Sequence, residues 1–107
     1  MSKVTIIGLG LIGNSIGMAL KRATVGGQSI EIVGFDPDRS QEEAALRKYG
    51  SVDSIAPNLE QAVRGAQLVV ISTPASAARE VLSAISPLLD EGATVTDTLP
   101  NKEQVMA

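Results

Sequence analysis

The hydrophobic pattern of the chain alternates between short apolar runs and longer segments in which apolar residues recur every three or four positions. The short runs predict buried β-strands, and the longer segments predict helices with one buried face. Strands are predicted at Val4–Ile7, Ile30–Phe35, Val52–Ala56, Leu68–Ser72 and Thr94–Thr96.

Helix start and stop residues lie between these strands. Ser40-Gln41-Glu42-Glu43 has the pattern of a capping box, which predicts an N-cap at Ser40. Helices are predicted at Leu11–Ala23, from Ser40 to a terminating Gly50, from a capping Asn58 to Gly65, and from the turn at Thr73-Pro74 to Ser86-Pro87. Lys102–Ala107 is predicted to be the start of a further helix. Glu42, Glu43 and Glu60 are interpreted as helix-start charges that imply no site.

Strict alternation of strand and helix is typical of right-handed βαβ units. We therefore expect an α/β fold: a Rossmann-like, doubly wound, mostly parallel five-stranded sheet with helices on both faces. The 107 residues suffice for a single domain over residues 1–107.

A glycine-rich stretch, GLGLIGNSIG, joins the first strand to the first helix. Gly8, Gly10 and Gly13 match G-x-G-x-x-G between a predicted strand and a predicted helix. In this motif the first glycine permits the tight turn, the second leaves room for a pyrophosphate and the third lets the helix lie close to the sheet. We expect Gly17 to let the next turn press against the sheet. The stretch predicts a dinucleotide-binding site, although a tight turn without a ligand would need similar residues.

An acidic residue ends the second strand. Asp36 follows Gly13 by 23 positions, close to the spacing of about 20 for the acid that binds the adenosine ribose. A carboxylate there accepts hydrogen bonds from both ribose hydroxyls and repels a 2′-phosphate, which favours NAD over NADP. Arg39 lies close enough to pair with a 2′-phosphate; we favour its interpretation as part of a solvated turn.

Polar residues also end the fourth and fifth strands. Ser72, Thr73 and Pro74 follow one apolar run and Asp97 follows the next, at the sheet edge where doubly wound folds bind ligands. These residues either line the nicotinamide side of the site or merely begin loops.

Composition excludes several classes of function. The net charge of −3 and the lack of a Lys/Arg cluster argue against a nucleic-acid partner. There is no cysteine and no histidine, which excludes disulfides, the usual Cys/His zinc sites and histidine acid–base chemistry within these residues. Glycines interrupt the N-terminal apolar run, so it does not resemble a signal peptide, and no run is long enough to span a membrane. We expect a cytoplasmic protein with no membrane partner.

The combined motifs are more specific than the glycines alone. GLGLIGNSIG after VTII, then VGFD, LVVISTP and VTDT followed by Lys102 resemble the NAD(P)-binding domain of prephenate and arogenate dehydrogenases over essentially the whole chain. β-Hydroxyacid dehydrogenases and related reductases share parts of the pattern. The resemblance implies an NAD(P)-dependent oxidative decarboxylation in tyrosine biosynthesis. In that family, a hydride passes from a cyclohexadienyl ring to the nicotinamide, the ring carboxylate leaves, and the product becomes a phenol.

The resemblance also implies roles for individual residues. Asp36 would hold the ribose, Thr73 and Pro74 would flank the nicotinamide half, and Asp97 would begin the loop that faces the active site. The residues carried over to the pyrophosphate are Gly8, Gly10, Leu11, Ile12 and Gly13.

The chain departs from the family pattern in two respects. Pro100 replaces the serine expected before Lys102, so the hydroxyl that would reach substrate or nicotinamide is missing. The catalytic histidine and the helical substrate-binding and dimerising domain of the family lie beyond the matching region, and we expect neither here. The favoured hypothesis is therefore a domain that binds NAD but turns over nothing alone. A stand-alone nucleotide-binding module or redox sensor, and a Rossmann-like domain that has lost its ligand, are the alternatives.

Overall fold

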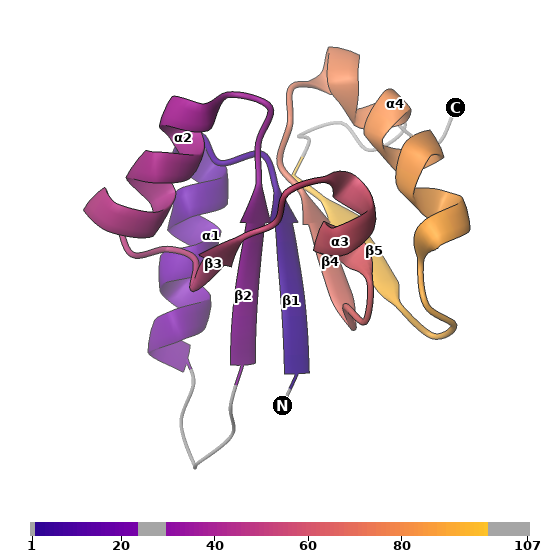
Figure 1. The fold of residues 1–107 in the computed structure, drawn as a ribbon, viewed down its shortest axis with the longest axis horizontal. Helices are drawn as coiled ribbons and strands as arrows, with labels where there is room; N and C mark the ends of the chain where they lie inside the picture. Colours follow the sequence, from indigo (N-terminus) through magenta and orange to yellow (C-terminus); the bar gives the residue numbers. More distant parts are fainter. Residues whose placement is uncertain (1, 24–29, 99–107) are drawn as a thin grey trace.

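All five predicted strands form one parallel sheet. The computed structural model describes residues 2–23 and 30–98, and it arranges the strands in the order β3-β2-β1-β4-β5 (Figure 1). Every neighbouring pair is parallel. The strands are β1 (Ser2–Ile7), β2 (Ile30–Phe35), β3 (Ser54–Ile55), β4 (Leu68–Ile71) and β5 (Thr94–Asp97). The Rossmann-like fold class is confirmed.

Helices cover both faces of this sheet (Figure 1). Alternate strand residues point to opposite faces, so Ile6 and Val70 join one apolar cluster while Ile7 and Val69 join the other. The first cluster contains side chains of α1 and η1, and the second contains side chains of α3 and α4. The helical segments are α1 (Leu11–Ala23), α2 (Arg39–Glu43), the π-helical turn η1 (Ala44–Lys48), α3 (Leu59–Val63), α4 (Ala75–Ile85) and the 3₁₀ turn η2 (Ser86–Leu88).

The start of α2 differs from the prediction, because its N-cap is Asp38 and not Ser40. The Asp38 carboxylate accepts hydrogen bonds from the Ser40 backbone N–H at 2.9 Å and from the Ser40 hydroxyl at 2.6 Å. Asp38 has extended backbone angles, whereas Ser40 already lies in the first helical turn. A carboxylate is favoured over a hydroxyl here because its charge also interacts with the positive end of the helix.

The other helix boundaries agree more closely with the pattern. Asn58 caps α3 by accepting the Gln61 N–H at 2.8 Å, and α4 ends at Ile85 before continuing as the short turn η2. Strand β3 is only two residues long, shorter than the predicted run. The predicted helix at Lys102–Ala107 and the departure at Pro100 lie outside the described residues.

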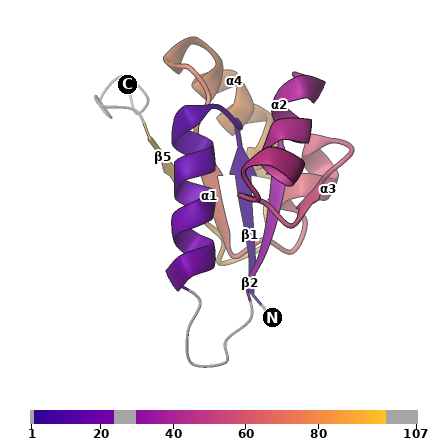
Figure 2. The ribbon, with the colours of Figure 1, turned by 90° about the vertical axis from the view of Figure 1, so that its left-hand side faces the viewer.

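The sheet reverses its direction of winding at β1. This strand pairs with β2 on one side and with β4 on the other, and each strand end faces the same edge. Figure 2 shows α1 starting beside the end of β1 and running back along it. In doubly wound sheets the carboxyl edge at this switch point is where ligands bind.

Candidate functional site

A pocket of about 580 Å³ lies at the carboxyl ends of β1 and β4. It contains eight of the residues proposed from sequence: Gly8, Gly10, Leu11, Ile12, Asp36, Ser72, Thr73 and Pro74. Pro37, Gln41, Ala77 and Thr98 also line it. The fold therefore brings together residues from the loops after β1, β2, β4 and β5.

The first two glycines of the motif meet different surroundings. Gly8 has a φ of +101°, and a Cβ there would lie 2.7 Å from the carbonyl carbon and oxygen of Ser72. Gly8 thus keeps the first loop against the end of β4. A Cβ on Gly10 would meet no atom within 4 Å. Gly10 therefore leaves open space at the wall of the pocket.

The last two glycines let α1 approach other backbone segments. A Cβ on Gly13 would lie 2.0 Å from the Gly8 carbonyl oxygen, so Gly13 acts behind the pocket and does not line it. A Cβ on Gly17 would lie 2.3 Å from the Ser51 carbonyl oxygen. The prediction that Gly17 lets this turn press against the sheet was wrong, because the backbone that Gly17 admits is that of Ser51, in the segment after η1.

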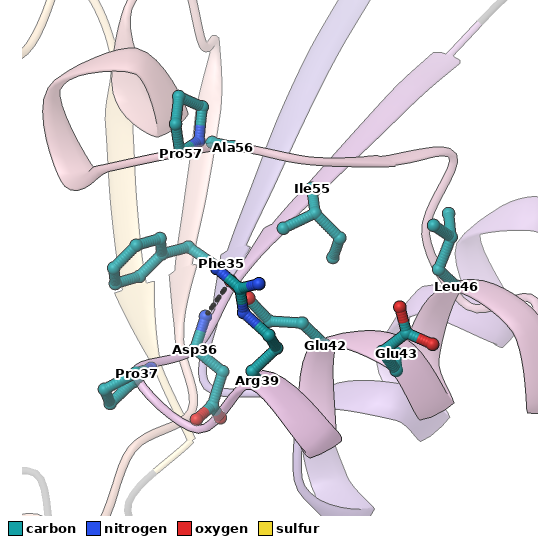
Figure 3. Close-up of a pocket in the computed structure, with 10 residues that line it drawn as sticks. All are labelled: Phe35, Asp36, Pro37, Arg39, Glu42, Glu43, Leu46, Ile55, Ala56 and Pro57. Atoms are coloured by element: carbon teal, nitrogen blue, oxygen red, sulfur yellow. Dashed lines mark hydrogen bonds between the residues drawn. The ribbon is translucent and has the colours of Figure 1, made fainter.

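Asp36 connects the loop after β2 to the glycine-rich loop. One carboxylate oxygen accepts the Leu9 N–H at 2.8 Å, and the other accepts the Asp38 N–H at 2.8 Å. The Asp36 N–H in turn donates to the Glu42 carboxylate at 3.2 Å, as Figure 3 shows. Glu42, interpreted from sequence as a simple helix-start charge, therefore also holds the backbone of Asp36. Its contact has no signal in the sequence pattern.

Arg39 lines a neighbouring pocket of about 490 Å³ and not the pocket described above. Glu42, Glu43 and Asp36 line this second pocket with it (Figure 3). Asp36 also lines the first pocket. The remaining lining residues are Phe35, Pro37, Leu46, Ile55, Ala56 and Pro57. Arg39 is exposed, and the pocket that it lines also carries the carboxylates of Glu42 and Glu43.

The loop after β4 presents an unsatisfied hydroxyl. Among the described residues, Thr73 has a side-chain oxygen that is buried and has no hydrogen-bond partner. The next residue, Pro74, is the N-cap of α4 and supplies no side-chain cap. Asp97 pairs with Ile71 in the sheet and does not line the pocket, whereas Thr98 beside it does.

Two large apolar side chains stand at the start of α1. Leu11 is 85% exposed and Ile12 is 53% exposed, although both line the pocket. Within the described ranges, no group of His, Cys, Asp or Glu side chains is arranged to hold a metal ion. The same part of the chain contains no helix with the length and apolar character needed to cross a membrane.

The chain matches a protein family and several curated relatives. Residues 16–107 match the family described as prephenate dehydrogenase, nucleotide-binding domain. The prephenate dehydrogenase of Lactococcus lactis subsp. cremoris (strain MG1363) is 34% identical over 107 residues, which cover 99% of this chain and 28% of that protein. The prephenate dehydrogenase of Bacillus subtilis (strain 168) is 32% identical over 96% of this chain and 27% of its own length.

Solved structures of the same kind share the fold. The crystal structure of prephenate dehydrogenase from A. aeolicus in complex with hydroxyphenyl propionate and NAD+ has a TM-score of 0.77 and 30% identity, over 91% of this chain and 33% of that chain. Synechocystis arogenate dehydrogenase has a TM-score of 0.78 and 28% identity, over 91% and 32%. The chain thus spans about a third or less of the length of these relatives.

Proposed function

The chain belongs to the family of prephenate dehydrogenase nucleotide-binding domains, and from that premise we propose that its larger pocket binds a nicotinamide dinucleotide, NAD in preference to NADP. We further propose that it serves an oxidative decarboxylation of the prephenate or arogenate type. The observation that carries the proposal is the open space beside Gly10, at the start of a helix on the switch-point edge.

The glycine-rich loop suits the pyrophosphate. Gly10 lines the pocket and has no side chain to hold a ligand away from the backbone. Helix α1 begins directly after it and has no acidic residue in its first turn. The positive end of the helix dipole and its free N–H groups therefore favour a negatively charged group at this point.

Asp36 suits the adenosine ribose. Each of its carboxylate oxygens accepts one backbone N–H, which leaves further acceptor capacity for two ribose hydroxyls. A 2′-phosphate would meet the charge of Asp36 and, behind it, that of Glu42. Both negative charges support NAD as the preferred cofactor, because they would repel a 2′-phosphate. We therefore propose no contact between Arg39 and the cofactor, and interpret Arg39 as a solvated residue.

The loop after β4 suits the nicotinamide half. Ser72, Thr73 and Pro74 line the pocket. The buried Thr73 hydroxyl has no hydrogen-bond partner among the described residues, and it would gain one by turning toward a bound ligand. Leu11 and Ile12 supply an apolar wall. Gly13 and Asp97 contribute indirectly. Gly13 lets α1 lie close to Gly8, and Asp97 places the adjacent Thr98 at the rim of the pocket.

The proposed reaction removes a hydride and a carboxylate from a cyclohexadienyl ring, so that the product is a phenol. The bound nicotinamide ring would accept the hydride. The residues of this chain bind and orient the cofactor. None of the 107 residues is a histidine that could act as an acid or base toward the hydroxyl group of the ring. We propose that these residues act as one domain that holds the cofactor without turning over substrate alone.

The first experiment is a titration of the chain with NADH, followed by the fluorescence of the reduced nicotinamide. We expect saturable binding. An absence of saturation at millimolar NADH by a folded chain would favour a domain that has lost its ligand, and would overturn the proposal.

Substitution of Asp36 tests the choice of cofactor. Asp36→Ala should weaken NADH binding by at least about tenfold, because hydrogen bonds to a charged group contribute about 1.5–3 kcal/mol and the loop contact is lost as well. NADPH binding should weaken less, since the repulsion of the 2′-phosphate is relieved. Glu43→Gln, which removes a nearby charge at the end of α2 that pairs with Arg47, is the control. An unchanged NADH to NADPH ratio in Asp36→Ala would exclude the ribose role.

A further inference from the structure

Leu9, between the first two glycines, is held on both sides of its backbone. Its side chain is fully buried in the cluster beneath α1. Its N–H donates to the Asp36 carboxylate at 2.8 Å, and its carbonyl oxygen accepts the side-chain amide of Asn14 at 3.0 Å. The conformation of this loop is therefore set by side chains as well as by glycines.

Asn14 is itself oriented by a distant serine. The Ser51 hydroxyl donates to the Asn14 side-chain oxygen at 2.6 Å, and the exposed fractions of these two residues are 0% and 5%. Ser51 is fixed in turn, because its N–H donates to the Ala45 carbonyl at 2.9 Å. The absence of a side chain at Gly17 admits the Ser51 backbone to this position.

The orientation of the Leu9 carbonyl determines where the next N–H points. In a trans peptide the C=O and the following N–H point in opposite directions, and no described peptide bond is cis. Because the Leu9 carbonyl is turned toward the buried amide of Asn14, the Gly10 N–H is turned away from it. Gly10 lines the pocket, where a pyrophosphate oxygen would need an N–H donor.

We propose that Asn14 and Ser51 are a positioning pair that keeps the Leu9–Gly10 peptide turned with its Gly10 N–H toward the cofactor pyrophosphate. The inference rests on the proposed function for its ligand, and on the hydrogen bonds within the chain for its geometry. Without the Ser51 hydroxyl, the Asn14 oxygen would be a buried acceptor without a donor. The amide would then rotate or rearrange, and the Leu9 carbonyl would lose its fixed partner.

The experiment compares Ser51→Ala with a control that loses an equally buried hydrogen bond elsewhere. Thr5 is fully buried, and its hydroxyl donates to the carbonyl of Ala62 in α3 at 2.5 Å. Thr5→Val therefore matches the loss of a buried hydroxyl but leaves the glycine-rich loop intact. Asn14→Ala is a second variant, and Ser51→Ala remains informative if Asn14→Ala does not fold.

Two measurements are made on each folded variant. The first is the amide signal and the N–H residual dipolar coupling of Gly10 in the ligand-free protein, measured by NMR. The second is the dissociation constant for NADH. We expect Ser51→Ala to change the Gly10 coupling and to weaken NADH binding about tenfold, the effect of one lost hydrogen bond to a charged group. Thr5→Val should change neither.

The results separate this inference from the proposed function. An unchanged Gly10 coupling in Ser51→Ala would overturn the positioning pair, whatever the cofactor does. A changed coupling in a chain that binds no NADH would support the pair and reject the proposed function. Equal weakening of NADH binding in Ser51→Ala and Thr5→Val would indicate a general loss of stability and would also overturn the inference.

Discussion

The four α-helices of the described residues begin in two different ways. Helices α2 and α3 are closed by side chains, since Asp38 accepts the Ser40 N–H and Asn58 accepts the Gln61 N–H. Helices α1 and α4 start without a capping side chain, because Gly10 precedes α1 and Pro74 is the N-cap of α4. The uncapped pair follows β1 and β4, the two strands on either side of the switch point.

Capped helix starts contribute to the stability of the fold, whereas uncapped helix starts leave N–H groups that a ligand can bind. A capping side chain satisfies N–H groups that would otherwise lack a partner, and it contributes about 1 kcal/mol to stability. Where the chain itself supplies no cap, those N–H groups are available to a ligand. The helix starts that line the larger pocket are the ones left open, and the neighbouring Thr73 hydroxyl is also without a partner among the described residues.

The largest effect is expected from Gly13, where α1 contacts the glycine-rich loop. Gly13→Ala places a methyl group 2.0 Å from the Gly8 carbonyl oxygen, so either the helix or the loop must move. Overpacking of this kind costs about 1–3 kcal/mol. Urea denaturation should show the loss of stability, and NADH binding should fall with it. A variant as stable as the parent would show that the start of α1 is not held by this contact.

A substitution at Gly10 should affect NADH binding and leave stability nearly unchanged. Its φ is not positive and a Cβ would meet no neighbour, so Gly10→Ala should change stability by less than about 0.5 kcal/mol. The methyl group would occupy the space proposed for the pyrophosphate, and NADH affinity should fall by at least about tenfold. The comparison of urea midpoint and NADH titration checks both. Unchanged affinity would mean that no ligand approaches this open helix start.

Removal of the capping side chain of α2 or α3 should have a smaller effect on stability. Only the loss of the Asp38 cap should depend on pH. Asn58→Ala should cost about 1 kcal/mol at every pH, because the amide does not titrate. The Ser40 hydroxyl and N–H hold the pKa of Asp38 below its ordinary value. A carboxylate with a lowered pKa in the folded state stabilises the protein above its unfolded pKa of about 3.9, and this contribution is lost as the pH falls through the folded pKa.

Thermal denaturation at pH 7 and near pH 2 tests this contrast. Asp38→Ala should lower the melting temperature clearly at pH 7 and much less at the acidic pH, whereas Asn58→Ala should lower it by similar amounts at both. Because Asp38 is fully exposed, its effect should also shrink in high salt. An Asp38→Ala penalty that is the same at both pH values would show that the charge of the cap contributes nothing.

The sequence by itself determined the fold class, the strand-to-helix turn that carries the glycines, and the strand end that carries Asp36. Apolar period and glycine spacing are local properties, and the carboxyl ends of parallel strands necessarily meet at one edge. The Asn58 cap could be predicted for the same reason, because donor and acceptor are only three positions apart.

Only the tertiary structure decided which distant segments meet. It placed Ser51 against Gly17 and joined its hydroxyl to Asn14, 37 positions away. It also set the Glu42 carboxylate on the backbone of Asp36. These contacts depend on the angle and distance at which helices pack on the sheet. Neither the period nor the spacing of residues along the chain specifies that geometry.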